Sequence, residues 1–245
     1  MYFEVDTHTH SVSSGHAYST VQEMAREAYL NGIKMFALTD HGPAMPGAPA
    51  LYHFGNLKAI PEFLYNVRVL KGAEANIIDY SGGLDIPEGY LKRLDFVMAG
   101  FHEICILPST KREHTEAMIN ALKNPYVDAV SHPGNPQFEV DIERVVATAK
   151  EFGKLIEINN HSFIVRTGSE KNCKNFALEC KRAGVKIVCG SDAHISFDVG
   201  KFNKVDELLQ GIDMPEELVM NTSIQKLYEY LEIKNKRIKN LTAKV

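Results

Sequence analysis

Ionisable side chains are concentrated in one strand-like stretch near the start of the chain, Asp6-Thr7-His8-Thr9-His10. Alternate residues of a β-strand share a face. One face is therefore expected to carry Glu4, Asp6, His8 and His10, and the other Phe3, Val5, Thr7 and Thr9. A buried strand with so many ionisable groups is unstable unless they are paired or bind a metal ion. The two imidazoles therefore indicate a metal site whose remaining ligands come from elsewhere in the chain.

Histidines and carboxylates also follow the other strand-like segments, near the residue where each segment ends. Strands are predicted at residues 2–7, 34–39, 67–73, 94–100, 127–131, 154–159 and 186–190. The candidate ligands at these ends and in the loops after them are His8, His10, His16, His41, Glu74, His102, His132, Asp192 and His194. A lone histidine beside a strand is usually an ordinary core or surface residue. That interpretation does not explain such residues at every strand end.

Helical patterns alternate with the predicted strands, which favours a parallel sheet. The helices are predicted at residues 20–31, 56–65, 87–93, 111–123, 141–152 and 169–183, and near 202–210, 215–219 and 222–232. Seven strand–helix units predict an α/β fold, a TIM-like (β/α)7 barrel that is distorted because it falls short of eight units. Active sites of such folds lie at the carboxyl ends of the strands. The candidate ligands are therefore expected to converge at that mouth of the barrel.

Nine converging ligands exceed the needs of one ion, because a catalytic zinc takes three protein ligands and keeps a fourth position open. The set fits three divalent metal ions with one carboxylate shared between two of them. Imidazole with carboxylate favours zinc, with manganese and iron as alternatives, and argues against a thiolate-rich or an all-oxygen site. The competing interpretation is a group of buried histidines that are hydrogen-bonded to the backbone.

The composition is typical of a globular protein without nucleic-acid or membrane partners. The 245 residues carry a formal net charge of −4, which counts against nucleic-acid binding. No stretch approaches the ~20 apolar residues of a membrane span, and the first residues lack a signal-peptide pattern. Four cysteines without a C-x-x-C pair predict reduced thiols. We therefore expect a cytoplasmic protein.

One domain is expected over residues 1–245, with C-terminal helices and a basic tail from about residue 222. The Lys-rich end, from Lys234 to Lys244, is expected to be a solvated helix end and tail. Away from the strand ends, His114 is expected at the surface of a helix start. His53, in the loop after the second strand, is a candidate for contacting substrate.

Taken together and in this order, the motifs resemble those of the PHP superfamily, which is named for polymerase and histidinol phosphatase. Within it they resemble the compact YcdX-type phosphatases. The resemblance runs from about Phe3 to about Leu231. It rests on Asp-Thr-His-Thr-His (6–10), Ser-Ser-Gly-His-Ala (13–17), Leu-Thr-Asp-His-Gly (38–42), Gly-Ala-Glu-Ala-Asn (72–76), His102, Ser-His-Pro-Gly (131–134), Glu-Ile-Asn-Asn (157–160) and Gly-Ser-Asp-Ala-His (190–194).

The resemblance implies a distorted barrel of seven βα units with a trinuclear metal centre at its carboxyl mouth, and a homo-oligomer, with a trimer as the expected form. The implied ligand sets are His8, His10, Glu74 and Asp192 for one ion, the bridging Glu74 with His102 and His132 for the second, and His16, His41 and His194 for the third. The chain departs from the family pattern at His161, where a small polar residue is expected. A tenth ligand, a substrate contact and a neutral surface change all stay open for it.

The chemistry expected of this centre is hydrolysis of a small phosphomonoester by a metal-bound hydroxide, with no side-chain nucleophile. Arg166, in the loop after the sixth strand, is a candidate to grip the phosphate oxygens, and a solvated loop arginine is the alternative. Asp6 and Asp40 are expected to accept the second ring N–H of coordinating imidazoles. For Asp40 the alternative is a turn-capping side chain.

Three other functions compete with a phosphatase. An amidohydrolase-like enzyme would share the first histidine pair, but its pattern usually has a lysine at the strand end where this chain has His102. A phosphodiesterase or nuclease would use the same metal centre, but the net negative charge counts against it. A binding module that has lost its metals would not be expected to keep a full ligand set.

Overall fold

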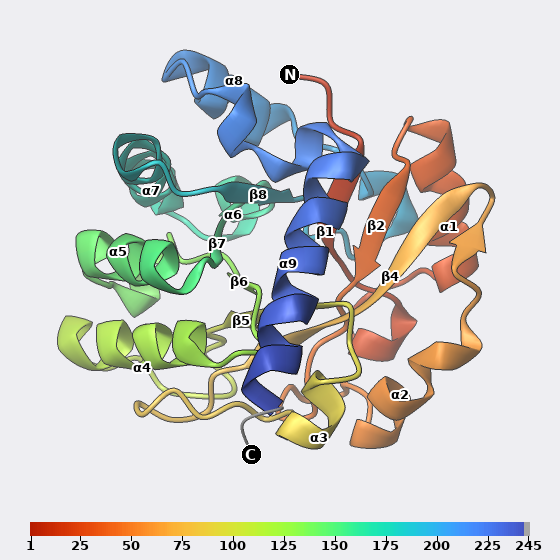
Figure 1. Ribbon diagram of the computed structural model, residues 1–245, viewed down its shortest axis with the longest axis horizontal. Coiled ribbons are helices and arrows are strands. Elements are labelled where there is room, and N and C mark those ends of the chain that lie inside the picture. Colours follow the sequence, from red (N-terminus) through yellow and green to blue (C-terminus); the bar gives the residue numbers. More distant parts are fainter. Residues whose placement is uncertain (243–245) are drawn as a thin grey trace.

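Seven parallel strands form the central sheet of the computed structural model, which describes residues 1–242 (Figure 1). In spatial order they are β1 (Val5–Thr9), β2 (Met35–Leu38), β4 (Val67–Asn76), β5 (Phe96–Gly100), β6 (Ala129–Val130), β7 (Leu155–Asn159) and β8 (Ile187–Gly190). Each overlaps one of the predicted strands, although β1 begins later than expected. The sheet nearly closes on itself, so the predicted distorted TIM-like barrel is confirmed, and all seven carboxyl ends lie at one mouth.

Helices connect the strands and cover the outside of the barrel (Figure 1). Capping boxes start two of them, at Thr20 with Glu23 and at Thr110 with Glu113. The helices are α1 (Val21–Leu30), α2 (Leu51–Asn56), α3 (Glu88–Leu91), α4 (Lys111–Lys123), α5 (Ile142–Phe152), α6 (Ser162–Val165), α7 (Ser169–Ala183), α8 (Asn203–Gly211) and α9 (Ile224–Thr242). Within residues 1–242, none of them combines the length and the apolar character that crossing a membrane requires.

The helix predicted over residues 56–65 is wrong. α2 ends at Asn56, a 3-10 turn covers residues 57–59, and β3 (Phe63–Leu64) then pairs antiparallel with the start of β4. Tyr65 and Asn66 join β3 to β4 with φ of 50° and 63°, the left-handed pair that a two-residue hairpin loop requires. The helix predicted at 215–219 is also only a 3-10 turn, α9 runs past the predicted 222–232, and α6 was not predicted.

The amino half of the barrel interior is apolar, and the last helix closes it. The inward-facing strand residues pack in one cluster with side chains of α9, comprising Val5, Met35, Leu70, Phe96, Met98, Ala129, Leu155, Val188, Leu227, Tyr230 and Leu231. Most of these strand residues stand at or near the first residue of their strand. α9 therefore covers the amino end of the barrel and passes in front of the strands in Figure 1. The carboxyl mouth is left to polar side chains.

The seam between β1 and β8 is joined in two different ways. Near the mouth, Thr9 forms a backbone bridge with Ala193. Nearer the amino end, the side chain of Asn221 fills the gap between the two strands. Its Nδ2 donates to the carbonyls of Val5 (2.8 Å) and Cys189 (2.7 Å), and its Oδ1 accepts from the Cys189 N–H (2.6 Å). One side chain thus replaces part of a strand ladder, which is where the barrel departs from regular closure.

A register shift in β1 determines which of its side chains enter the barrel. Asp6 pairs with Phe36, but Thr9 pairs with Leu38, so β1 contains one residue more than β2 over this stretch. Phe36 and Leu38 pack in the core outside the barrel, so Asp6 and Thr9 also face outward, and His8 between them faces inward. The prediction that Asp6 shares a face with the two histidines is therefore wrong, because a bulge shifts the alternation by one residue.

Lys234 is buried in α9 and pairs with Asp128 at the start of β6. Its Nζ lies 2.5 Å from Asp128 Oδ2 and donates to the carbonyl of Asp95 at 3.0 Å. The prediction of a solvated Lys-rich end is wrong at this residue, because α9 continues across the end of the barrel. Lys244, at the end of the predicted basic tail, lies outside the described residues.

Replacing Lys234 by methionine is expected to lower the free energy of unfolding by about 3–5 kcal/mol, because it leaves the buried Asp128 without its cation. Urea unfolding followed by circular dichroism measures the change. Lys236→Met is the matched control. Lys236 is exposed and lies 4.0 Å from Glu232, so its loss should cost less than about 1 kcal/mol. Equal effects of the two substitutions would contradict this account of Lys234.

Candidate metal centre

The nine predicted ligand residues lie together at the carboxyl mouth of the barrel. They come from the ends of β1, β2, β4, β5, β6 and β8 and from the loops that follow. Six of them are buried, namely His8, His10, His41, Glu74, His132 and Asp192. His102 and His194 are half-buried, and His16 is exposed. The convergence that strand order predicted is therefore present in the structure.

Glu74 stands at the centre of this group, and its two carboxylate oxygens face different imidazoles. Oε2 lies 3.2 Å from His8 Nε2, 3.5 Å from His10 Nε2 and 3.0 Å from His41 Nδ1. Oε1 lies 2.7 Å from His132 Nε2 and 3.5 Å from His102 Nε2. A fully buried carboxylate with ring nitrogens on both sides has the arrangement of a bridging ligand.

The Nδ1 atoms of His8 and His10 both have hydrogen-bond partners, and these partners determine whether the Nε2 atoms carry a proton. His8 Nδ1 lies 2.7 Å from the Glu157 carboxylate, which can only accept, so this nitrogen carries the proton. His10 Nδ1 lies 3.1 Å from the Ser14 hydroxyl, whose own proton goes to Asp40. Both Nε2 atoms are then unprotonated in the neutral rings, yet they face each other at 3.0 Å. Two lone pairs at that separation, beside a carboxylate, repel each other unless a proton or a metal ion lies between them.

Another group of imidazoles, here called the third group, consists of His16, His41 and His194 and lies next to the ring of His10. The ring of His16 is 5.1 Å from that of His41 and 4.8 Å from that of His194, measured between centroids. His10, His41 and His194 each offer a ring nitrogen within 4.8 Å of the others. Asp192 Oδ1 links this group to the first, because it lies 3.2 Å from His10 Nε2 and 3.6 Å from His194 Nδ1.

Buried polar atoms without hydrogen-bond partners also converge on this position. Among the described residues they include His41 Nδ1, Glu74 Oε2, His102 Nδ1 and Nε2, and His132 Nε2. Each such atom left unpaired costs about 1–3 kcal/mol. Coordination of divalent ions would satisfy the ones that face Glu74, and imidazole with carboxylate is the donor set of zinc, manganese or iron. The residues present therefore fit a metal centre.

Most charges in the site favour the states that bind metal, and His8 is the exception. Burial opposes charging of His8, but the carboxylates of Glu157, Glu74 and Asp192 raise its pKa well above the usual value. Burial opposes ionisation of Glu74, but His8 and His102 hold its pKa well below the usual range. Burial and the charge of Arg166 lower the pKa of His132 to about 3. Burial and His41 lower the pKa of His10 well below its usual value. Ionised carboxylates and neutral imidazoles are the forms in which these groups coordinate.

Glu157 in β7 accepts hydrogen bonds from two of the predicted ligands, a role that was not predicted from the sequence. Its Oε1 accepts from His8 Nδ1, and its Oε2 accepts from the backbone N–H of His132 at 2.6 Å. Gly190, on the neighbouring strand β8, leaves space for the Glu157 side chain, because a Cβ there would lie 2.0 Å from Glu157 Oε1. The feature of the sequence that could have revealed this role is the position of Glu157, an acidic residue inside the otherwise apolar stretch Leu155–Ile158 of a buried strand.

Asp6 does not accept from any ring, so that prediction is not met. Because it faces outward, its carboxylate binds the Ser191 hydroxyl (2.5 Å) and the N–H of Gly200 (2.9 Å), and so fixes the loop after β8. Asp40 acts on His10 only through Ser14. Its carboxylate also accepts from the backbone N–H of Ser11 at 2.8 Å, which is the turn-capping alternative.

Two histidines outside the group of nine also differ from expectation. His53 lies in α2 rather than in a loop, with its Nε2 3.2 Å from Asp40 Oδ2. His114 is buried rather than on the surface. Its Nε2 accepts from the Ser109 N–H at 2.7 Å, and its Nδ1 lies 3.1 Å from the carbonyl of Glu139. It therefore joins the loop before α4 to the one after β6, away from the metal centre.

Two predicted ligands have backbone conformations that L-residues rarely adopt. His132 has φ of 31° and Asp192 has φ of 55°. Hydrogen bonds hold both of them, because His132 N–H donates to Glu157 and Asp192 N–H donates to the carbonyl of His8 at 2.9 Å. Residues in sparsely populated φ regions cluster at functional sites, where the surrounding structure maintains them.

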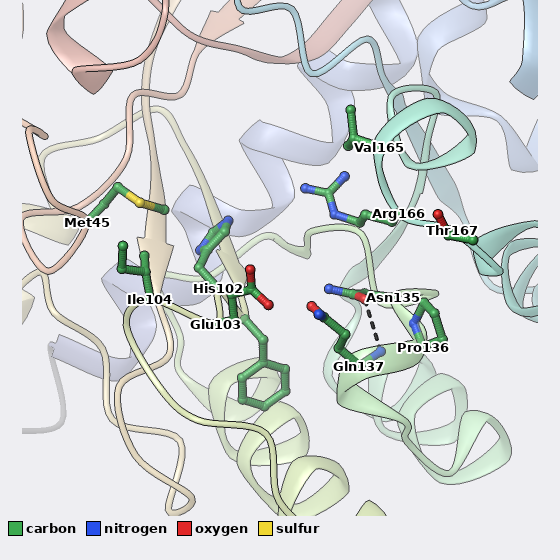
Figure 2. Close-up of a pocket in the computed structure, with 11 residues that line it drawn as sticks. Met45, His102, Glu103, Ile104, Asn135, Pro136, Gln137, Val165, Arg166 and Thr167 are labelled. Carbon is green, nitrogen blue, oxygen red and sulfur yellow. Dashed lines mark hydrogen bonds between the residues drawn. The ribbon is translucent and has the colours of Figure 1, made fainter.

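An open cavity of about 510 Å³ lies beside His102. Figure 2 shows Arg166 and Asn135 reaching from one side toward His102 and Glu103 on the other. The Arg166 guanidinium lies 3.3 Å from Asp192 Oδ2, so one face of it is held at the metal site while it also lines the cavity. The predicted position of Arg166 at the active face agrees with the structure. His161 lies at the start of α6, with its Nδ1 3.0 Å from the carbonyl of Asp192.

Comparisons with known proteins point to one family. The pattern of the PHP domain family matches residues 6–242. A probable phosphatase of Acetivibrio thermocellus is 71% identical over 239 residues, which are 98% of this chain and 99% of that protein. A probable phosphatase of Caldanaerobacter subterraneus subsp. tengcongensis is 56% identical over 236 residues, covering 96% of this chain and 93% of that protein.

A solved structure shares the fold. It is histidinol phosphate phosphatase from Lactococcus lactis, complexed with zinc, L-histidinol and phosphate, with a TM-score of 0.60 and 18% sequence identity. The match covers 88% of this chain and 95% of that one. At this identity the likeness concerns the arrangement of the barrel.

Glu157→Gln is expected to weaken metal binding by about 10–100-fold, as loss of a group that orients a ligand typically does. An amide can accept at one end only, so it cannot serve both His8 Nδ1–H and the His132 N–H. Titration of metal into stripped protein, with competition by a chromophoric chelator, measures the change. Glu151→Gln, at an exposed position of α5, is the matched control. Unchanged metal affinity in Glu157→Gln would show that Glu157 does not orient His8.

Proposed function

The chain belongs to the PHP family and is a metal-dependent phosphatase, and from this premise we propose that it hydrolyses a small phosphomonoester at a centre of three divalent metal ions. The observation that carries the proposal is the buried Glu74 carboxylate, with ring nitrogens against both oxygens. A carboxylate with ring nitrogens beside both of its oxygens favours one metal ion on each side over a single ion. Residues 1–245 would form one PHP domain.

We divide the nine ligands into three sets around this carboxylate. The first ion would lie among the facing nitrogens of His8 and His10 and the oxygens of Glu74 and Asp192. The second would lie on the other side of Glu74, and the third among the outer imidazoles. The proposed sets are His8, His10, Glu74 and Asp192, then Glu74, His102 and His132, and finally His16, His41 and His194. Zinc is the metal we expect, because seven imidazoles dominate the donors.

Divalent ions bound there would lower the pKa of a water molecule and neutralise charge on the phosphate oxygens. The chain's own residues would position the reactants. Glu157 holds the imidazole ring of His8, and Asp40 holds the ring of His10 through Ser14. Arg166 offers guanidinium N–H groups between Asp192 and the cavity, where they would bind the oxygens of a phosphate. The cavity beside His102 would receive the organic part of the substrate, with Asn135 and Glu103 as its polar walls.

Removal of bound metal with a chelator is expected to abolish hydrolysis of a generic aryl phosphate, and zinc or manganese to restore it. The substrate panel adds the corresponding diester and an amide analogue. Rapid cleavage of the monoester alone supports the proposal. Activity confined to the diester would indicate a phosphodiesterase or nuclease, and activity on the amide an amidohydrolase-like enzyme.

The matched variants for this experiment are His8→Ala and His10→Ala. Each should lose metal and reduce turnover by at least about 100-fold, because the centre then lacks a ligand of its first ion. Metal content by elemental analysis and folding by circular dichroism are measured on the same samples. Folded variants with full metal content and undiminished hydrolysis would overturn the ligand assignment.

A further inference from the structure

His161 is placed beside the third group of imidazoles by a turn that is anchored on both sides. Asn159 Oδ1 accepts from the N–H of Ser162 at 2.8 Å. Asn160 Oδ1 accepts from the N–H groups of Lys204 (3.0 Å) and Val205 (3.2 Å) at the start of α8. The residue between these anchors has little freedom to move away, so its ring position is built into the fold.

The backbone carbonyl of Asp192 determines the tautomer of two imidazoles, those of His161 and His194. It lies 3.0 Å from His161 Nδ1 and 2.9 Å from His194 Nδ1. A carbonyl can only accept, so both Nδ1 atoms carry protons and both neutral rings have unprotonated Nε2 atoms. A backbone carbonyl bonded to one ring nitrogen is the usual device that prepares the other nitrogen for a metal. The Nε2 atom of His161 is therefore left unprotonated in the same way as that of His194, which already belongs to the proposed centre.

The separation of the two rings suits a shared ion. A zinc–nitrogen bond of about 2.0–2.1 Å places the ring centre about 3 Å from the metal, so two rings on one ion have centres about 5–6 Å apart. The centroids of His161 and His194 are 5.9 Å apart, and the rings meet edge to face. The pair His16 and His194, assigned above to one ion, is 4.8 Å apart.

We propose that His161 is a tenth metal ligand, whose Nε2 binds the ion assigned to His16, His41 and His194. The three imidazoles of that set leave a tetrahedral ion one ligand short, and His161 would complete four nitrogen donors. The inference rests on the proposed three-ion centre. It adds a ligand at the position where this sequence departs from the family pattern.

Two substitutions separate a ligand from a side chain that merely supports Asp192. Asparagine at 161 keeps an N–H that can reach the Asp192 carbonyl but has no atom in the place of Nε2, whereas alanine removes both. Stripped wild-type protein, His161→Asn and His161→Ala are each titrated with Co²⁺ alone, and the visible spectrum and stoichiometry are recorded. Competition with a chromophoric chelator gives the Zn²⁺ affinities. Ile164→Ala, at an exposed position of the same short helix, is the control.

Both His161 variants are expected to bind one of the ions about 10–100-fold more weakly, with an altered Co²⁺ spectrum, while Ile164→Ala matches the wild type. A defect in alanine but not in asparagine would overturn the proposal in favour of a supporting role. Wild-type affinities and spectra in both variants would also overturn it, even if the KM for an aryl phosphate rose. Failure of the wild-type protein to bind metal would instead contradict the proposed function itself.

Discussion

The rest of the structure depends on the burial of one carboxylate, Glu74, at the carboxyl mouth of the barrel. A buried carboxylate is tolerated only when cations or donors surround it. Here imidazoles from four other strands surround the carboxylate, and the Ser131 hydroxyl donates to Oε1 at 2.6 Å. Imidazoles alone do not suffice, since several of their nitrogens face the carboxylate without a hydrogen bond. This unpaired set distinguishes the centre from an ordinary buried polar network, in which each donor would have an acceptor.

The barrel is built in two halves so that such a group can be buried. The amino half is filled with apolar side chains and closed by α9, which supplies the stability that the polar half does not. In the mouth, a second tier of polar residues holds the imidazoles from behind. Glu157 binds His8, the Ser14 hydroxyl binds His10, and the Asp192 carbonyl binds His194. Each of these bonds directs the free nitrogen of a ring toward the centre.

The order of strands and helices was sufficient to predict the barrel and the convergence of the nine residues, because carboxyl ends of parallel strands meet at one mouth whatever the loops do. The orientation of Asp6 was not predictable, since the alternation breaks at a bulge that only the pairing with β2 reveals. Glu157 was missed because no repeating pattern marks a residue that faces the ligands from behind. Lys234 was misjudged because a lysine in a basic stretch usually points to solvent, and its buried partner, Asp128, is far away in the sequence.

The positions of the proposed ligands connect the metal centre to closure of the barrel. His8 and His10 lie on the first strand, and Asp192 and His194 follow the last, so they meet across the seam between β1 and β8. The backbone joins this seam only near the mouth, and Asn221 bridges the rest. An ion held by both strands would bind only the closed barrel. It would therefore stabilise closure by about 2.7 kcal/mol when its concentration is 100 times its dissociation constant. The chain would then complete its fold and its reactive site in the same step, because neither the seam nor the ligand set exists in an open sheet.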